Sequence, residues 1–255
     1  MPDLSTSPVA IVTGGSRGLG RSTVLALAGR GVRSLFTYHS NADAAREVAA
    51  LSREAGAEGV ALQLDTSDAS SFDGFANQVR AALASFGAER FDYLVNNAGT
   101  GHYAPFAETT EEAFDRLYAI HLKGVFFLTK ALLPLLNDGG RIVNLSSGLA
   151  RFSLPGSSAY AAMKGGVEVL TRYLAKELAG RGITANTVAP GAIETDFGGG
   201  AVRDNPDLNR MVSGMTALGR AGVPEDIGPM IAALLTDANR WVTGQRIEVS
   251  GGMNL

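Results

Sequence analysis

Short apolar runs alternate with longer segments of helical periodicity along almost the whole chain. The run at residues 9–13 is apolar and ends in a cluster of glycines, as expected of a strand buried on both faces. The next segment, residues 18–31, places Leu25, Leu27 and Ala28 where the inner face of a helix needs apolar side chains. This alternation is typical of a parallel sheet with helices on both faces.

The same pattern continues toward the C-terminus and places the other elements. It predicts strands at residues 9–13, 34–38, 60–64, 91–96, 141–147, 183–188 and 246–249. It predicts helices at residues 18–31, 42–55, 68–86, 111–136 and 158–181. Because connections between parallel strands are right-handed, the simplest fold is α/β, with a single Rossmann-type doubly wound sheet of about seven strands.

Length and composition fit one folded unit. The chain has 255 residues, of which 45% are hydrophobic and 18% charged, so a core can form and disorder is not expected. We therefore expect a single domain over residues 1–255. Residues 197–210 are glycine-rich and then polar, and we expect this irregular stretch to be part of a substrate lid over residues 197–215.

Charge and residue counts exclude several kinds of partner. The net charge is −3 without a basic run, whereas nucleic-acid phosphates require clustered Lys and Arg. The absence of cysteine excludes disulfides and thiolate chemistry, and His39, His102 and His121 lack metal-ligand spacing, so no metal is expected. The first eight residues do not resemble a signal peptide, and no stretch approaches the roughly 18 apolar residues of a membrane span. We expect a cytoplasmic protein with no membrane contact.

A glycine-rich turn follows the first predicted strand and precedes a helix. Its spacing is G-x-x-x-G-x-G, which permits a tight turn and close approach of the backbone to a pyrophosphate. The free amides of the helix N-terminus attract phosphate, and the Gly-Lys-Ser/Thr of a P-loop is absent. The turn indicates dinucleotide binding, with a purely structural turn as the alternative. The cofactor contacts expected here are Gly14, Ser16, Arg17, Gly18, Leu19 and Gly20.

Four motifs, in order, resemble the short-chain dehydrogenase/reductase family. They are the glycine turn, Asn-Asn-Ala-Gly at residues 96–99, Tyr-x-x-x-Lys at residues 160–164, and Pro-Gly-Ala-Ile-Glu-Thr at residues 190–195. They span nearly the whole chain, and the overall similarity is greatest to 3-oxoacyl-carrier-protein reductases. The resemblance implies an NAD(P)(H)-dependent oxidoreductase that reduces a ketone to a secondary alcohol, in a dinucleotide-binding and catalytic domain. It also implies a homotetramer.

Tyr160 is the expected proton donor. A free phenol has a pKa near 10, and Lys164, one helical turn later on the same face, is expected to lower it. A chance pair on a solvated helix is the alternative. By resemblance, Lys164 also holds the ribose hydroxyls of the nicotinamide. The family's catalytic serine lies thirteen residues before its tyrosine, which selects Ser147 as donor to the substrate oxygen and leaves Ser146 structural.

The sequence departs from the family pattern at His121. The family usually has an asparagine at this place in its long helix, where it helps to hold a water linked to the lysine. Two interpretations of His121 stay open. It is either a core histidine bonded to backbone or a direct member of the proton relay, because imidazole titrates near neutrality.

The end of the second predicted strand bears on the choice of cofactor. Members specific for NAD have an acid there, but this chain has Tyr38, His39 and Ser40. Arg17 is available to a 2′-phosphate, so NADP(H) is favoured over NAD(H), with a solvated loop residue as the alternative role. By resemblance, further cofactor contacts are Asp65 and Thr66 at the adenine, Asn97, Ala98 and Gly99 at the adenosine ribose, and Ile193 and Thr195 at the nicotinamide amide, beside Pro190 and Gly191.

The substrate is a small-molecule carbonyl or alcohol of unspecified identity. Two roles are open for a set of four apolar residues: they line the mouth of the site near Tyr160, or they are ordinary core packing. The residues are Leu149, Phe152, Leu154 and Met215. Residues 137–140 lack the basic side chains that members acting on carrier proteins place there, so docking of a carrier is not favoured. Two rival functions remain, an NAD(H)-linked alcohol or sugar dehydrogenase and a non-catalytic dinucleotide-sensing regulator.

Overall fold

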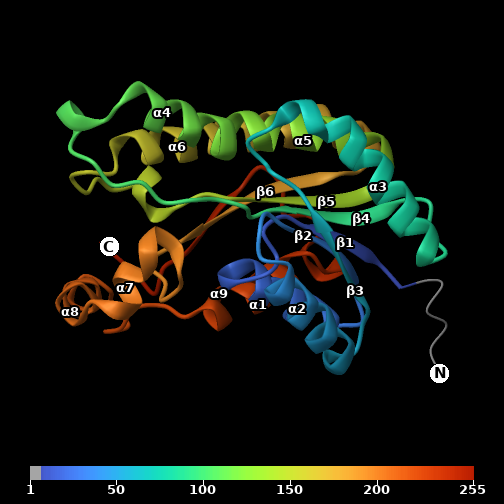
Figure 1. Ribbon diagram of the computed structural model, residues 1–255, viewed down its shortest axis with the longest axis horizontal. Coiled ribbons are helices and arrows are strands. Elements are labelled where there is room, and N and C mark those ends of the chain that lie inside the picture. Colours follow the sequence, from blue (N-terminus) through green and yellow to red (C-terminus); the bar gives the residue numbers. More distant parts are fainter. Residues whose placement is uncertain (1–6) are drawn as a thin grey trace.

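A seven-stranded parallel sheet lies between two layers of helices in the computed structural model, which describes residues 7–255 (Figure 1). The strand order is β3-β2-β1-β4-β5-β6-β7, and every neighbouring pair is parallel. The order reverses between β1 and β4, where a doubly wound sheet opens a crevice at the carboxyl ends of its strands. The α/β fold class is confirmed. The prediction about a signal peptide concerned the first eight residues, of which residues 1–6 lie outside the described residues.

The bounds of most elements agree with the sequence pattern. The strands are β1 (Val9–Val12), β2 (Arg33–Tyr38), β3 (Gly59–Gln63), β4 (Phe91–Asn96), β5 (Leu136–Leu145), β6 (Thr184–Pro190) and β7 (Arg246–Val249). The helices are α1 (Gly18–Ala28), α2 (Ala42–Ala55), α3 (Phe72–Ser85), α4 (Glu111–Tyr118), α5 (Gly124–Leu132), α6 (Ser158–Glu177), α7 (Ala201–Asp204), α8 (Pro206–Gly214) and α9 (Pro224–Leu234).

Alternate residues of each central strand face different helix layers. Val9 and Ile11 of β1 belong to the core beneath α3, α5 and α6, whereas Ala10 and Val12 belong to the core shared with α1, α2 and α9 (Figure 1). All four are buried. Burial on both faces explains why the strands are nearly continuous apolar runs. Because each face of the sheet packs against one helix layer, both layers are held in place relative to the edge where the strands end.

The single helix expected at residues 111–136 is interrupted. It consists of α4, a π-helical turn at Ala119–Lys123, and α5, and it ends in a 3₁₀ turn at Leu133–Leu135. The strand after it begins at Leu136, not at residue 141, and ends at Leu145, not at residue 147. Leu136 pairs with Phe91, and the register then shifts before Arg141 pairs with Tyr93. The glycine pair within this irregularity concealed the start of the strand.

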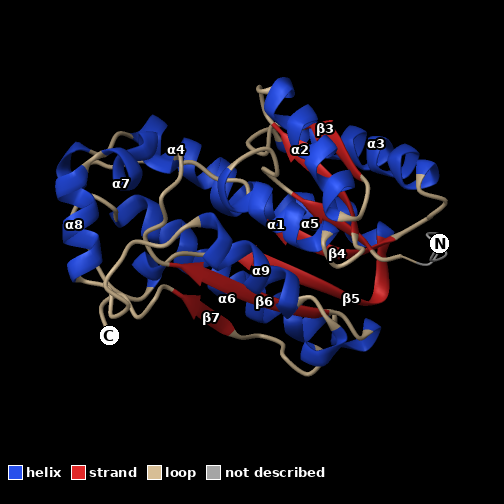
Figure 2. Cartoon of the chain, turned by 90° about the horizontal axis from the view of Figure 1, so that it is seen from below, coloured by secondary structure: helices blue, strands red, loops and turns tan. Residues whose placement is uncertain are grey.

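The expectation of an irregular stretch at residues 197–210 was wrong. The segment forms α7 and α8, which lie beyond the carboxyl ends of β6 and β7 (Figure 2). Asn205 caps α8, because its side-chain oxygen accepts from the amides of Asp207 and Leu208 at 3.0 and 3.1 Å. Helix α9 was not anticipated, although it begins at a proline followed by two acids, a common start for a helix.

The expectation about membrane-like segments was too strong. The helical run Glu111–Leu135 has a mean hydropathy of 1.2 over 18 residues and is long enough to cross a bilayer by length and composition alone. It covers one face of the sheet, and only 33% of that window is buried. Its apolar character therefore comes in part from exposed side chains, among them Phe126 and Phe127.

Candidate active site

The glycine turn is fastened to two neighbouring segments. The amide of Gly14 donates to Thr37 Oγ1 of β2 at 2.9 Å, and Asn97 Nδ2 donates to the carbonyl of Thr13 at 2.8 Å. A Cβ on Gly20 would lie 2.1 Å from the carbonyl oxygen of Gly14, so only glycine fits there. Because α1 has no side-chain cap, the first amides of this helix are free for a phosphate.

One cavity of about 800 Å³ is lined by this turn, by Tyr160 and by apolar side chains. The part next to the glycine turn is called here the dinucleotide end, and the part beyond Tyr160 the substrate half. The cavity brings together most of the expected cofactor contacts from the ends of β1, β2, β3, β4 and β6. These are Gly14, Ser16, Arg17, Gly18, Leu19, Tyr38, His39, Asp65, Thr66, Asn97, Ala98, Gly99, Pro190, Gly191, Ile193 and Thr195. Gly20, Ser40 and Ser147 do not line it. Within residues 7–255, no group of three or more His, Asp and Glu side chains is placed to hold a metal ion.

The dinucleotide end of the cavity contains one acidic side chain and several basic side chains. The acid is Asp65, which follows β3 and not β2. Its Oδ2 lies 3.6 Å from Nε2 of His39, which follows β2. The pKa of Asp65 is held below its usual value, chiefly by a hydrogen bond from Ser67. Arg17 and Arg116 line the same end. Sequence reasoning missed Arg116, whose only signal is its place on the long helix, between one and two turns before His121.

Helix α6 carries Tyr160 and Lys164 one turn apart, and both side chains are buried. Lys164 Nζ donates to the carbonyl of Leu145 at 2.7 Å and lies 5.5 Å from the centroid of the Tyr160 ring. Both side chains line the cavity that begins at the glycine turn. The pair therefore shares one face of α6, and that face looks toward the crevice.

The expected lowering of the tyrosine pKa is not found. Burial raises the pKa of Tyr160 well above its ordinary value, and only the neighbouring Ser147 hydroxyl acts in the opposite direction. Burial also lowers the pKa of Lys164 to about 7. The ammonium is thus only partly populated at neutral pH and is held by a carbonyl, so it does not offset the loss of solvent around the phenol.

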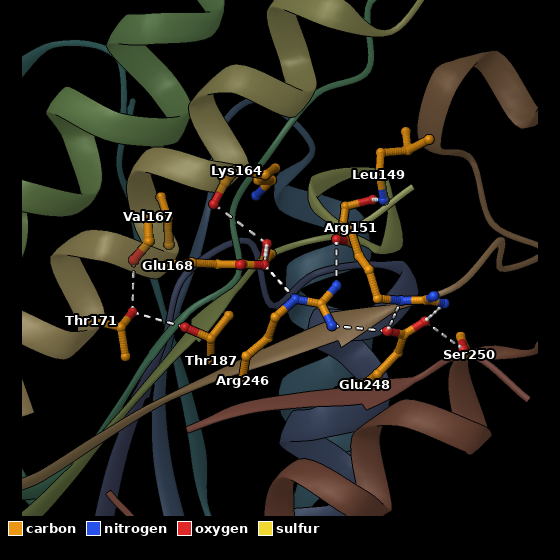
Figure 3. Close-up of polar contacts among 12 residues, drawn as sticks. Leu149, Arg151, Lys164, Val167, Glu168, Thr171, Thr187, Arg246, Glu248 and Ser250 are labelled. Atoms are coloured by element: carbon orange, nitrogen blue, oxygen red, sulfur yellow. Dashed lines mark hydrogen bonds and ion pairs between the residues drawn. The ribbon is translucent and has the colours of Figure 1, made fainter. Parts of the chain in front are cut away.

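A polar network supports the chain behind Ser147. Arg246 of β7 donates to Glu168 of α6 at 2.7 Å and to the carbonyl of Ser147 at 3.2 Å (Figure 3). Ser146 Oγ donates to the same Glu168 carboxylate at 2.7 Å. The Ser146 hydroxyl is therefore engaged by Glu168, although Ser146 also lines the cavity, whereas the hydroxyl of Ser147 bonds the Tyr160 phenol. The network fixes the end of β5 between α6 and β7.

His121 lies in the π-helical turn between α4 and α5, edge-on to Tyr160 with ring centroids 5.1 Å apart. Its Nε2 lies 2.8 Å from the carbonyl of Thr100, and its buried Nδ1 has no partner among the described residues. Burial, and then the charge of Lys164, lower the pKa of His121 to about 3. The argument that this imidazole titrates near neutrality was therefore wrong. Its bond to backbone and its free nitrogen leave both proposed roles open.

The substrate half contains the expected mouth residues and several others. Leu149, Phe152, Leu154 and Met215 line the cavity, as the sequence indicated. The predicted lid contains Phe197, Leu208, Met211 and Val212, which also line the cavity but were not singled out, and Met253 was missed. These five come from segments without a motif, and only tertiary packing gathers them around the cavity.

Comparisons with known proteins agree with this geometry. The family model described as enoyl-(acyl carrier protein) reductase matches residues 14–254. A short-chain type dehydrogenase/reductase of Picea abies is 36% identical over 260 residues, covering 96% of this chain and 91% of the relative. A 3-oxoacyl-[acyl-carrier-protein] reductase of Synechocystis sp. is 38% identical over 251 residues, covering 97% of each chain.

Solved structures of ketoreductases superpose closely. The promiscuous reductase LugOII, which catalyses keto-reduction at C1 during lugdunomycin biosynthesis, gives a TM-score of 0.93 at 36% identity, covering 99% of this chain and 100% of the other. The angucycline C-6 ketoreductase LanV with bound NADP gives 0.92 at 34% identity, covering 97% and 95%. The chain therefore belongs to the short-chain dehydrogenase/reductase family and is an oxidoreductase acting on carbonyl or alcohol groups, as its motifs predicted.

Proposed function

We propose that this chain is an NADP(H)-dependent reductase that converts a ketone to a secondary alcohol, with Tyr160 as proton donor. The observation that carries the proposal is the position of Tyr160. Its buried ring stands in the wall of one cavity, between the glycine turn and an apolar end. A ketone held in that apolar end lies between a hydride source and an acid.

The state of Tyr160 favours reduction. When bound, the nicotinamide supplies the hydride that the carbonyl carbon accepts. Tyr160 then gives its phenolic proton to the carbonyl oxygen, where negative charge develops. Because the developing alkoxide is a stronger base than a phenolate, a phenol whose pKa is raised by burial still donates to it. Oxidation requires the phenolate, which burial disfavours.

Ser147 and Lys164 complete the proposed machinery. The hydroxyl of Ser147 lies at the phenol and is available to donate to the same substrate oxygen. Lys164 donates one proton to the carbonyl of Leu145, and its remaining N–H protons are available to ribose hydroxyls. We assign His121 the role of a neutral acceptor, whose free Nδ1 holds a proton-relay water near Lys164.

The charge distribution at the dinucleotide end supports NADP(H). Arg17 and Arg116 both line the cavity, and the end of β2 offers His39 where an acid would repel a 2′-phosphate. The presence of NADP in the similar ketoreductase LanV is consistent with this choice. Paired titrations with NADPH and NADH, followed by fluorescence, test it. We expect tighter binding of NADPH, and tighter binding of NADH would contradict the assignment.

We infer a substrate lid over residues 197–215, because Phe197, Leu208 and Met211 of this segment line the cavity.

We also infer a homotetramer. The outer faces of the helix layer that contains α4, α5 and α6 carry large exposed side chains, which a second copy would cover. They are Tyr118, Phe126, Phe127, Val169 and Tyr173, with exposed fractions from 41 to 61%. Light scattering at micromolar concentration measures the assembly, and a monomer there would contradict it.

The function itself is tested by NADPH consumption with a panel of small and bulky ketones. We expect turnover of at least one bulky apolar ketone, and loss of that turnover in Tyr160→Phe. The same panel with NADH separates the NAD(H)-linked alternative. Binding of NADPH with no turnover of any ketone in either direction would favour a dinucleotide sensor.

A further inference from the structure

The substrate half of the cavity has walls of apolar side chains. These side chains come from three segments, namely the turn after β5, the start of the lid, and helix α8 with the residue that follows it. They are Leu149, Phe152, Leu154, Phe197, Met211 and Met215. The shape and chemistry of a bulky hydrocarbon therefore match this half of the cavity better than those of a polar chain.

No free cation lies in the substrate half among residues 7–255. Among the described residues that line the cavity, the only Lys and Arg are Arg17 and Arg116, at the dinucleotide end, and Lys164, which is bound to a carbonyl. The one acid at the substrate half, Asp196, is already paired with Arg203 at 2.5 Å. A substrate carboxylate or phosphate would be desolvated there without a countercharge, which is strongly unfavourable.

Phe197 places an aromatic ring next to the proposed acid. Its ring centroid lies 5.8 Å from that of Tyr160 at an interplanar angle of 60°, and 46% of the residue is exposed. The loop after β4 also approaches the ring, because Phe197 Cε1 is 3.1 Å from where a Cβ of Gly101 would be. Three glycines with positive φ, at residues 198–200, follow Phe197 and turn the chain back toward α7.

We propose that the substrate is an uncharged ketone carried on an aromatic or fused-ring system, and that Phe197 selects it by contact with the ring next to the carbonyl. This inference rests on the proposed reductase function, because it names the substrate class of that reaction. Aromatic rings gain from contact with Phe152 and Phe197 and from the sulfur atoms of the methionines.

The test measures binding of alcohols that mimic the product, by calorimetry with NADP⁺ present and absent. The matched pair is α-tetralol and α-tetralin carboxylate, which share a fused-ring skeleton and differ in charge. We expect α-tetralol to bind at least about 100-fold more tightly than the carboxylate. Cyclohexanol, which lacks the aromatic ring, should bind about tenfold more weakly than α-tetralol. Equal or tighter binding of either comparison ligand would overturn the proposal.

The variant Phe197→Leu isolates the ring. It keeps an apolar side chain of similar size, and we expect the affinity for α-tetralol to fall about three- to tenfold while that for cyclohexanol is unchanged. Phe106→Leu is the matched control, because Phe106 is 86% exposed and does not line the cavity. An equal loss for both ligands in Phe197→Leu would show that the ring does not select the substrate.

A complementary variant adds the missing charge. Met211 lines the cavity and is 53% exposed, so Met211→Lys can project an ammonium to the mouth without burying it. We expect the carboxylate to gain about tenfold in affinity relative to α-tetralol. No gain would contradict the inference that the substrate half selects uncharged ligands because it lacks a countercharge.

Failure of the inference is distinguishable from failure of the proposed function. If α-tetralol binds as expected but α-tetralone is not reduced with either cofactor, the reductase assignment fails and the ligand class stands. If small aliphatic ketones are reduced while the carboxylate binds as well as α-tetralol, the reductase assignment stands and the ligand class fails.

Discussion

The two ends of the cavity are built in different ways. At the dinucleotide end, main-chain groups hold much of the shape, as in the bonds from the Gly15 amide to the Thr37 carbonyl at 2.8 Å and from the Thr13 amide to the Val95 carbonyl at 3.0 Å. In the substrate half, side chains such as Leu149 and Met215 supply the wall, and they come from distant segments. One end is therefore fixed by the backbone and the other by replaceable side chains.

This difference separates what the fold recognises from what a single member recognises. Backbone amides at a helix N-terminus bind a pyrophosphate whatever the substrate, so the dinucleotide end serves any reaction of the nicotinamide. Side chains beyond the carboxyl edge of the sheet can be exchanged without disturbing the strands. We expect substitutions at the dinucleotide end to cost binding and folding together, and those in the substrate half to change ligand choice alone.

The largest effect is expected for Tyr160→Phe, at the boundary between the two ends. The variant keeps the ring that packs against His121 and Phe197 and loses only the proton. We expect kcat for ketone reduction to fall about 100- to 10,000-fold. The dissociation constant of NADPH, measured by fluorescence, should stay within about threefold. Retention of more than about a tenth of kcat would remove Tyr160 from its proposed role.

The next largest effect is expected for Gly20→Ala, which tests how rigid the dinucleotide end is. In Gly20→Ala, the new methyl would lie 2.1 Å from Gly14 O and 2.7 Å from Asn97 Nδ2, so the turn has to move. We expect a loss of about 2–3 kcal/mol in unfolding free energy and about tenfold weaker NADPH binding. Gly74→Ala on α3 is the matched control, since its methyl meets no atom within 4 Å. Similar results for both variants would contradict a rigid turn.

Residues of the dinucleotide end could be predicted because their information is local. The glycine turn and the Tyr160–Lys164 pair each lie within eight consecutive residues, and helix or turn geometry alone brings their groups together. Long-range packing then placed the turn and the pair beside one cavity, which the alternation of strands and helices already implied.

The features that could not be predicted from the sequence depend on contacts between distant segments. Phe197 is an ordinary residue in a glycine-rich stretch until the fold brings it to Tyr160. The pKa of Tyr160 was predicted in the wrong direction because burial cannot be read from a four-residue spacing. The start of β5 was missed for a similar reason, since pairing of Leu136 with Phe91 overrides the local preference of two glycines.

The third prediction concerns pH and the buried lysine. The pKa of Lys164 is about 7 in the folded chain, against an ordinary value of 10.5. Between these values the unfolded chain binds a proton that the folded chain lacks, so the free energy of unfolding rises with pH. Lys164 should contribute a gain of about 2 kcal/mol between about pH 7 and pH 9. Urea unfolding of the cofactor-free protein measures it, and Lys164→Met should lack this gain. Equal slopes for both proteins would contradict the depressed pKa.

A smaller effect is expected for His121→Phe, which keeps an aromatic ring beside Gly99 and Tyr160 but removes the free Nδ1. We expect kcat to fall about tenfold while the dissociation constant of NADPH changes by less than about threefold. His121→Asn, which restores an acceptor, should recover most of kcat. Unchanged turnover in His121→Phe would leave His121 as a core residue bonded to Thr100.

The smallest effect is expected for Leu149→Ala, which tests whether the substrate half is independent of the dinucleotide end. Leu149 is half-buried in the cavity wall, and its amide donates to Ser147 Oγ at 3.2 Å, a bond that alanine preserves. Leu149→Ala therefore removes only apolar contact, and KM for a bulky ketone should rise about three- to fivefold. NADPH affinity and melting temperature should not change. If NADPH affinity falls as much as KM rises, the two ends are coupled through the Ser147 turn, and side chains in the substrate half cannot be exchanged without cost to the cofactor.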